Sequence, residues 1–272
     1  LGLAAGVQGD RYTEQAGATA AGRTGGVSVH GVRSLQNNFL LDGLDNNSIS
    51  TNVQELTTQV ARPSVDAIGE FKVVTSPYSA EYGRAPGAAI SVTTKSGTNS
   101  FRGTGYEYHR NEAFNATDFF TNRQGAPKPD YSLNSFGGNL GGPIVRNRAF
   151  FFGDYEGTRL TQGVTRQTVV PTENERRGIF STTIRDPLTG QPFPNNTIPA
   201  HRIDPVARVI MDLFPLPNAS GPNNYFRTAN AVDDADRYLA RLDFQVTAVD
   251  SLFARYSYTD RFRFIPGNFG GK

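Results

Sequence analysis

Two acidic side chains, Asp154 and Glu156, are the first candidates for chemistry in this sequence. They lie two positions apart in the run FFFGDYEG, so an extended strand would place both on one face. Paired carboxylates can act as general acid and base when an apolar pocket raises the pKa of one of them. The sequence shows no such pocket, and a strand face lined with polar groups explains both residues.

The other chemical groups form no recognisable catalytic or metal-binding pattern. The chain has no cysteine, which excludes disulfides, thiolate metal sites and a thiol nucleophile. Its histidines are too far apart to give a metal-ligand pair at helical or hairpin spacing. No serine lies in a nucleophile elbow, and the glycine pairs near residues 137–142 lack the lysine and helix of a phosphate loop. The sequence predicts no enzyme, no cofactor and no metal.

The acidic segment LDGLDNN is a further candidate. Asp42 and Asp45, with the asparagines that follow, could bind calcium through hard oxygen ligands. The ligand set of an EF-hand is incomplete, however, and Asp42-Gly43 is a strong hairpin signal. We therefore interpret this segment as a turn.

Composition limits the class of protein. The chain has 272 residues with a formal net charge of +2, so nucleic acid is not an expected partner. It contains 29 Gly, 11 Tyr and 19 Phe but no Trp, which favours a turn-rich β protein. No run of 18 apolar residues exists, so no transmembrane helix is predicted. The first 25 residues lack the features of a signal peptide, and we expect the chain to be an internal piece of a longer protein.

Residues from Ser100 onward predict five strands, each long enough to cross a membrane at a tilt. Alternation is clearest in the last two, where one face is apolar and the opposite face is polar or charged. In the fourth, Leu242 and Phe244 alternate with Arg241 and Asp243. The five segments span 101–109, 132–142, 149–159, 237–247 and 251–262.

The connections between these strands alternate in length. Short links at 143–148 and 248–250 contrast with long ones near 110–131 and 160–236. Short turns at one rim and long loops at the other are typical of outer-membrane barrels. Within the longer loop, Asp204 and Pro205 predict the start of a helix with an apolar stripe that ends before Pro215.

The first hundred residues carry several short strand signals. They fall at 27–32, 38–41, 71–75 and 89–94, with a short helix expected near 53–60. This region contains EFKVVTSPYSAEYGR followed by GAAISVTTKSGTN. Its sequence resembles the end of the plug of TonB-dependent outer-membrane transporters, and in particular their Oar-like branch. VSVHGV with NNFLLDGLDNN, FFFGDYEG, and the Pro-rich loop before Asp236 share the resemblance, which extends from about Val27 to Tyr258.

The resemblance implies an α+β plug followed by an antiparallel all-β transmembrane barrel segment. Residues 1–99 would form an N-terminally incomplete plug, and residues 100–272 a partial barrel of about five strands with open edges. The complete barrel would have about 22 strands. The implied function is energised uptake of an unidentified substrate across the bacterial outer membrane. TonB would act on a segment upstream of this sequence.

The resemblance also implies that plug arginines pair with barrel carboxylates. The candidates are Arg33 and Arg84 on the plug, with Glu107, Asp154 and Glu156 on the barrel. The expected lumen-facing residues are Arg241, Asp243, Gln245, Arg255 and Ser257. The expected lipid-facing residues are Tyr106, Tyr108, Phe151, Tyr155, Tyr238, Leu242, Phe244, Val246, Leu252, Tyr256 and Tyr258.

Two other functions remain open from the sequence. The same barrel could serve as a non-transporting adhesin or scaffold, which energy coupling would distinguish. A secreted all-β binding domain is the second alternative. In that case both strand faces would be covered or polar, and the loops would not alternate in length.

Overall fold

The computed structural model describes residues 7–9, 27–32, 37–47, 59–75, 87–117, 119–123 and 128–270. These residues form mainly strands, in two compact units. The first unit comprises Leu1–Gln162 and Ala231–Ile265, and the second comprises Gly163–Asn230 and Pro266–Lys272. Among the described residues, no helix is long and apolar enough to cross a membrane.

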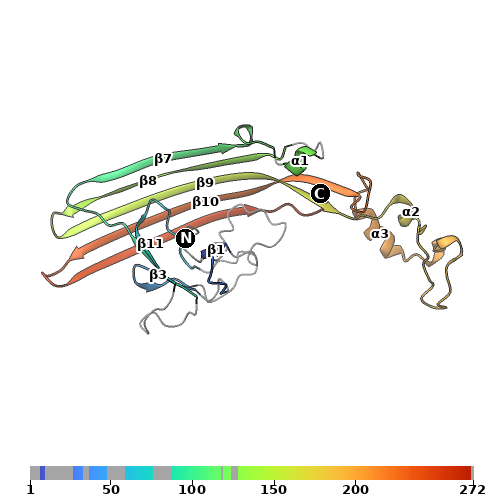
Figure 1. Ribbon diagram of the computed structural model, residues 1–272, viewed down its shortest axis with the longest axis horizontal. Coiled ribbons are helices and arrows are strands. Elements are labelled where there is room, and N and C mark those ends of the chain that lie inside the picture. The colour runs from blue at the N-terminus through green and yellow to red at the C-terminus, as the bar shows by residue number, and fades with distance from the viewer. Residues whose placement is uncertain are drawn as a thin grey trace. The chain divides into compact units, whose positions relative to one another are not determined.

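The first unit contains a sheet of long strands, drawn side by side in Figure 1. Each strand neighbours the next one in sequence, in the order β11-β10-β9-β8-β7. Within the described chain β7 and β11 do not pair, so this sheet is open. All five predicted strands are confirmed. They are β7 (Arg102–Asn111), β8 (Tyr131–Val145), β9 (Ala149–Thr168), β10 (Tyr225–Gln245) and β11 (Ser251–Phe264).

Two of these strands are longer than predicted. β9 continues to Thr168 and β10 begins at Tyr225, so the connection between them is shorter than the expected 160–236. The extra residues of β9, LTQGVTRQT at 160–168, are mostly polar and give no regular apolar alternation to detect. Backbone pairing and polar contacts extend the strands there, as between the hydroxyls of Thr165 and Thr228, 3.0 Å apart.

Aromatic rings lie over glycines of neighbouring strands and fix the spacing of the sheet. Tyr106 on β7 lies opposite Gly137 on β8. A Cβ atom added at Gly137 would lie 2.8 Å from the Tyr106 hydroxyl and 2.3 Å from the backbone oxygen of Tyr155. Phe136 covers Gly157 in the same way. The glycines therefore admit rings from neighbouring strands, which compensates for their own lack of a side chain.

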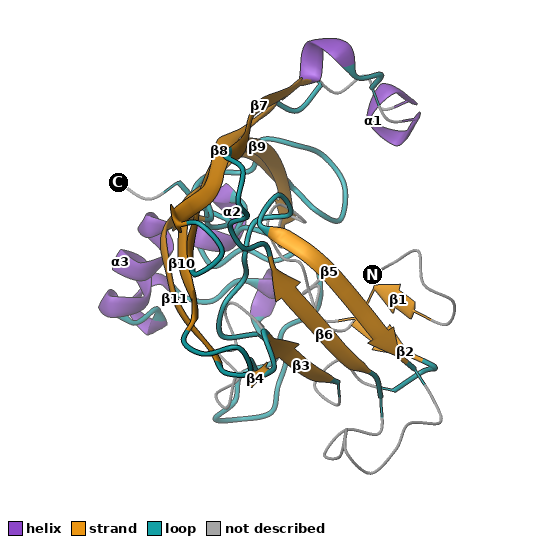
Figure 2. Ribbon diagram, turned by 90° about the vertical axis from the view of Figure 1, so that its left-hand side faces the viewer, coloured by secondary structure: helices purple, strands orange, loops and turns teal. Residues whose placement is uncertain are grey.

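A smaller sheet precedes the long strands and is termed the N-terminal sheet. Its strands are β3 (Asn38–Leu41), β4 (Leu44–Asp45), β5 (Ile68–Val74) and β6 (Ala89–Thr94). Their order is β4-β3-β6-β5, with β3 parallel to β6 (Figure 2). β1 (Val7–Gly9) and β2 (Val27–Val29) pair separately. A core of Val7, Val29, Phe39, Ala88 and Ile90 joins these elements.

The predicted turn at Asp42-Gly43 is confirmed. It links β3 to β4, and both residues have positive φ, 50° and 80°. Such a two-residue turn suits Asp and Gly because both tolerate the left-handed conformation. Most of the helix predicted near 53–60 lies outside the described residues. At its end, Gln59 forms an isolated bridge with Asn47.

The second unit is built from short elements. They are α2 (Glu173–Arg176), two 3₁₀ turns at Pro194–Asn196 and Ala200–Arg202, and α3 (Pro205–Leu213). Asp204 caps α3 by accepting from the Val206 amide at 2.7 Å, which confirms the predicted helix start. In the first unit, a 3₁₀ turn (Glu112–Phe114) and α1 (Phe119–Arg123) connect β7 to β8.

An ion pair organises the second unit. Both terminal nitrogens of Arg202 bond to Asp186, and the Leu188 amide donates to the same carboxylate at 2.9 Å. These hydrogen bonds lower the pKa of Asp186 to about 2. The guanidinium also lies over the ring of Phe193, 5.3 Å from the ring centre. The cluster thus fixes the hairpin that ends near Phe193 against the turn that carries Arg202.

We expect replacement of Gly137 by alanine to destabilise the long-stranded sheet by about 1–3 kcal/mol, because the new methyl group meets backbone and ring atoms. Gly153→Ala is the matched control, since a Cβ there meets no atom within 4 Å. Urea unfolding of the protein in detergent measures both. Equal stability of the two variants would contradict the packing described for Tyr106 and Gly137.

Candidate functional site

One face of the long-stranded sheet contacts the N-terminal region, and is termed the inner face; the opposite face is the outer face. Buried Ala67, which precedes β5, packs against Phe152 of β9 and Leu239 of β10. Polar contacts on the same face involve Asp42 and Ser64. The candidate site is the set of polar groups that joins these two parts of the first unit.

The turn after β3 positions the carboxylate of Asp42. The Asp42 amide donates to the Val92 carbonyl at 2.8 Å, which ties the turn to β6. Thr94 donates to the carboxylate from its amide at 2.7 Å and from its hydroxyl at 2.9 Å. Asp42 is therefore fixed within the N-terminal sheet while its oxygens remain able to accept further hydrogen bonds.

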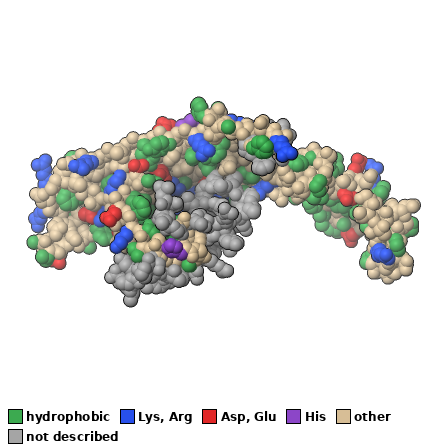
Figure 3. All heavy atoms as spheres, viewed as in Figure 1, with side chains coloured by type: hydrophobic (Ala, Val, Ile, Leu, Met, Phe, Trp, Pro, Cys, Tyr) green, Lys and Arg blue, Asp and Glu red, His purple; other side chains and the backbone are tan. Residues whose placement is uncertain are grey.

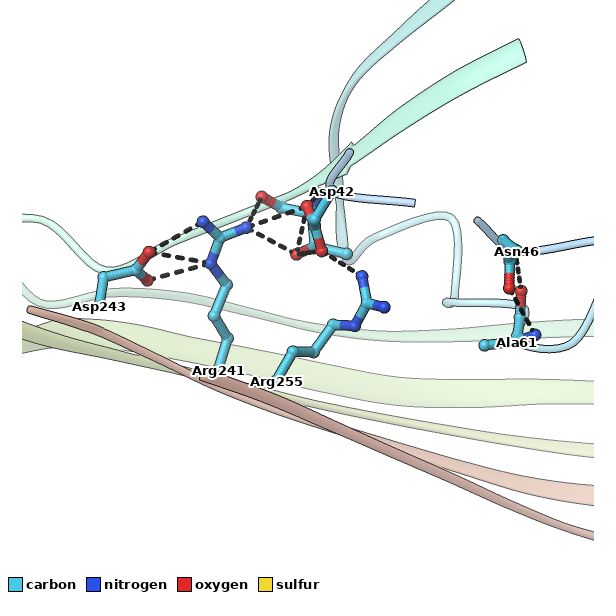
Figure 4. A network of polar contacts seen from close by, with 7 residues as sticks. Asp42, Asn46, Ala61, Arg241, Asp243 and Arg255 are labelled. Carbon is cyan, nitrogen blue, oxygen red and sulfur yellow. Dashed lines mark hydrogen bonds and ion pairs between the residues drawn. The ribbon is translucent and has the colours of Figure 1, made fainter. Parts of the chain in front are cut away.

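Two guanidinium groups of the inner face bind this carboxylate (Figure 4). Arg241 on β10 and Arg255 on β11 are directly opposite in the strand register, so both side chains leave the same face. Arg241 Nη1 lies 3.0 Å from Asp42 Oδ1. Arg255 Nη1 pairs with the other oxygen, Oδ2.

Asp243 holds Arg241 from the other side (Figure 4). Its carboxylate accepts from Arg241 Nε at 3.0 Å and from Nη2 at 2.8 Å, and the guanidinium lies 4.8 Å from the ring centre of Phe253. The side chains of Asp42, Arg241 and Arg255 are only 3%, 11% and 14% exposed. The ion-pair cluster, comprising Asp42, Arg241, Asp243 and Arg255, thus has two charges of each sign and little contact with water.

Complete pairing is what makes this burial tolerable. Each ion loses several kcal/mol of hydration when it is taken out of water, and mutual attraction offsets this loss only when the geometry satisfies every group. Removing one partner leaves the other buried and uncompensated. The cluster therefore makes the contact between the two sheets sensitive to a single charge.

Asp154 makes a second polar contact to the N-terminal region. Ser64 donates to Asp154 Oδ2 at 2.6 Å and accepts from the Ala67 amide at 3.0 Å. Asp154 is 7% exposed, and its Oδ1 atom has no hydrogen-bond partner. It lines a cavity of about 200 Å³ that Arg62 and Arg237 also line.

The expected plug–barrel contacts are only partly observable. Arg33 and Arg84 lie outside the described residues, so their predicted pairing stays a prediction. Glu156 is on the inner face, but its partners are Arg237 and the Tyr106 hydroxyl, the latter at 3.4 Å. Asp154 bonds to Ser64 rather than to an arginine.

The face assigned to β7 requires a correction. Tyr106 and Tyr108 were expected on the lipid side and Glu107 on the lumen side. The register instead places Tyr106 in line with Gly137 and Glu156, on the inner face, and the ring of Tyr108 stacks on that of Tyr106 at 5.5 Å. Glu107 faces outward, beside Phe136. Tyrosine combines an apolar ring with a polar hydroxyl and suits either face, so alternation alone did not fix the phase of this strand.

The other predicted faces agree in phase with the register. Arg241, Asp243, Gln245, Arg255 and Ser257 share the inner face. On the outer face, the rings of Tyr155, Tyr238 and Tyr258 follow one another at 5.0 and 6.3 Å. Contact of this face with lipid stays a prediction. The remaining expected lipid-facing residues on it are Phe151, Leu242, Phe244, Val246, Leu252 and Tyr256.

Sequence reasoning missed the role of Asp42, which it treated as a turn residue. Its partner Arg241 is 199 positions away, and nothing local to the turn indicates that contact. The sequence did contain one weak indication that the two arginines meet. Arg241 and Arg255 are equally far from the short turn after Gln245, which places them opposite each other in a hairpin. Among the described His, Asp and Glu side chains, no group of three or more is arranged to hold a metal ion.

Comparison with known families agrees with the observed sheet. The sequence profile of the outer membrane beta barrel domain family matches residues 93–272. The chain belongs to this family. It is accordingly a protein of the bacterial outer membrane, and the five long strands are those of an outer-membrane barrel segment.

The chain is also similar to a curated transporter. It is 28% identical over 157 residues to the TonB-dependent transporter Oar of Myxococcus xanthus, an alignment covering 56% of this chain and 13% of that protein. The resemblance to the Oar-like branch of TonB-dependent transporters is thereby confirmed. The chain thus spans about an eighth of the length of this relative.

An outer membrane transporter of known structure shares the fold of this chain. The outer membrane transporter YddB from Escherichia coli matches with a TM-score of 0.50 and 15% identity, over 88% of this chain and 27% of that chain. The siderophore receptor PirA from Acinetobacter baumannii matches with a TM-score of 0.46 and 15% identity, over 88% and 26%.

We expect Asp42→Asn to weaken the attachment of β6, and with it the N-terminal sheet, to the long-stranded sheet by about 3–5 kcal/mol. The reason is that two buried guanidinium groups lose the negative charge that they share. Hydrogen exchange of the segment 89–94 measures this, since the Thr94 amide bonds to Asp42. The double variant with Arg255→Gln should lose less than the sum of the two single variants. Arg177→Gln, in an exposed pair with Glu173, serves as the control. Strict additivity would contradict coupling through the cluster.

Proposed function

We propose that this chain provides the plug and the first barrel strands of a TonB-dependent transporter that takes up a substrate across the outer membrane. Residues 1–99 form the plug, and residues 100–272 form the strands, with extracellular loops near 112–130 and 169–224. TonB acts through a segment outside this sequence. The chain itself performs no catalysis.

The observation that carries this proposal is the ion-pair cluster. A plug must stay inside the barrel at rest and must also be able to move. Asp42, on the N-terminal sheet, is held by Arg241 and Arg255 of the wall, and the apolar contact at Ala67 is small by comparison. Such an attachment is tolerated while every charge is paired, and displacement of one partner leaves an uncompensated buried charge.

Both sides of the cluster retain partners after separation, which supports a reversible release. Arg241 keeps its contacts with Asp243 and Phe253, while Asp42 keeps both hydrogen bonds from Thr94. Arg255 is the group that loses its carboxylate. Release therefore costs less than breaking an isolated buried pair, and water entering the gap solvates the freed charge. The plug arginines Arg33 and Arg84 would add further contacts.

The two faces of the sheet support a membrane-spanning wall. In lipid every backbone polar group needs an internal partner, so strands cross a membrane only in a closed barrel. The outer-face side chains from Tyr238 to Val246 are exposed and apolar, over about the nine residues that a tilted spanning strand needs. The unpaired edges of β7 and β11 would pair with the barrel's remaining strands.

Spin labels test the orientation of the wall. The sequence has no cysteine, which simplifies labelling at single introduced cysteines. In lipid bilayers, labels at Leu242 and Tyr256 should relax faster with oxygen, which concentrates in hydrocarbon. Labels at Ser257 and Gln245 should respond more to a water-soluble nickel complex. The reverse pattern, or no difference between the faces, would refute a lipid-facing outer surface.

Accessibility of position 64 tests energised movement without knowledge of the substrate. Ser64 is buried against Asp154, so a Ser64→Cys variant should react slowly with a membrane-impermeant thiol reagent at rest. In energised cells with TonB, we expect labelling to accelerate severalfold. An uncoupler or loss of TonB should abolish the increase. Ser251→Cys, at the exposed start of β11, should label equally throughout. Labelling independent of TonB would instead favour a non-transporting scaffold.

A further inference from the structure

Arginines predominate on the inner face of the last two strands. Over the paired stretch from Val232 to Gln245 of β10 and along β11, the inner positions carry five arginines but only two acidic residues, Asp233 and Asp243. Residues two positions apart on a strand point to the same face and lie about 7 Å apart. Because the two strands are paired, their arginines therefore lie along one surface at steps of this size. The five are Arg237, Arg241, Arg255, Arg261 and Arg263.

At rest, carboxylates neutralise these arginines. Asp233 accepts from Arg261 at 2.7 and 2.6 Å and lies 3.8 Å from Arg263. Glu156 of β9 pairs with Arg237. These acids belong to the wall itself and stay with it. Asp42 differs, because it reaches the arginine surface from the N-terminal sheet.

We propose that Arg241 and Arg255 form a binding site for a carboxylate or phosphate group of the transported substrate, and that Asp42 occupies this site at rest. The proposal rests on the proposed function, since Asp42 leaves only if the plug moves. Without Asp42, the cluster retains two guanidinium groups and one carboxylate, Asp243. The wall thus gains a net positive charge where the path opens.

The geometry around Asp42 matches what an oxyanion requires. Each of its two oxygens meets a different guanidinium, and charge-assisted bonds of this kind are stronger than neutral ones. Asp243 and the ring of Phe253 keep Arg241 oriented, so little ordering is needed when an anion binds. In the described part of the chain, Asp42 is the carboxylate that pairs with Arg255.

The neighbouring cavity extends the same surface. The cavity of about 200 Å³ is lined by Arg237 and by the hydroxyl groups of Ser257 and Thr259. Ser257 lies one level from Arg255 on β11, and Thr259 lies opposite Arg237. An anion that leaves Arg255 would therefore meet further donors next. Asp154, which also lines this cavity, would oppose an anion and limit how long it stays.

Chemical rescue tests the site directly. Asp42→Gly removes the carboxylate while keeping a residue suited to positive φ. In the purified protein in detergent, hydrogen exchange of segment 89–94 should accelerate in this variant. Sodium acetate or inorganic phosphate at constant ionic strength should restore protection, while neutral acetamide should not. Rescue by acetate alone would indicate a carboxylate on the substrate, and rescue by phosphate alone a phosphate group.

A second substitution identifies the residues responsible. Adding Arg255→Gln to Asp42→Gly should weaken the apparent affinity for the rescuing anion by about tenfold, as expected for the loss of one charge-assisted hydrogen bond. Arg177→Gln, outside the surface, should leave rescue unchanged. Absence of rescue by either anion, or equal rescue in the Arg255 variant, would overturn the proposal. These measurements need no TonB, so they remain informative even if energised movement of Ser64 is not found.

Discussion

Burial of charge is the constraint on which the contact between the two sheets depends. Asp42 is almost fully enclosed, and its burial is tolerated because two arginines and Thr94 surround its carboxylate with hydrogen-bond donors. The surrounding architecture serves this arrangement. The hairpin register sets Arg241 opposite Arg255, and the turn after β3 places the Asp42 carboxylate between Thr94 of its own sheet and these two arginines (Figure 4).

Near the short turn between β10 and β11, charge on the inner face contrasts with apolar side chains on the outer face. The space-filling view in Figure 3 shows charged side chains of both signs together with hydrophobic groups along the long strands. Alternation separates them, because successive residues of a strand point to opposite sides. A single strand segment such as RLDFQ therefore supplies both an ionic contact for a neighbouring sheet and an apolar surface suited to hydrocarbon.

Local rules predicted much of this fold. The five long strands, the Asp42-Gly43 turn and the helix after Asp204 each depend on neighbouring residues, and each was found where it was expected. The phase of β7 was not, because Tyr106 faces inward to fill the space above Gly137 on another strand. The extensions of β9 and β10 lack alternation and were missed. The partnership of Asp42 with Arg241 depends on how distant segments dock, which no local pattern encodes.

The positive φ of Asp42 limits which residues can replace it. At φ 50°, glycine and asparagine are the other residues that fit readily, and both are uncharged. Glutamate would keep the charge, but it tolerates this backbone poorly and its longer side chain would displace the arginines. Aspartate is therefore the one acidic residue that suits this position, and no other residue would give a contact of intermediate strength. A lineage can keep this electrostatic contact or abandon it, but it cannot tune the contact through the residue at position 42.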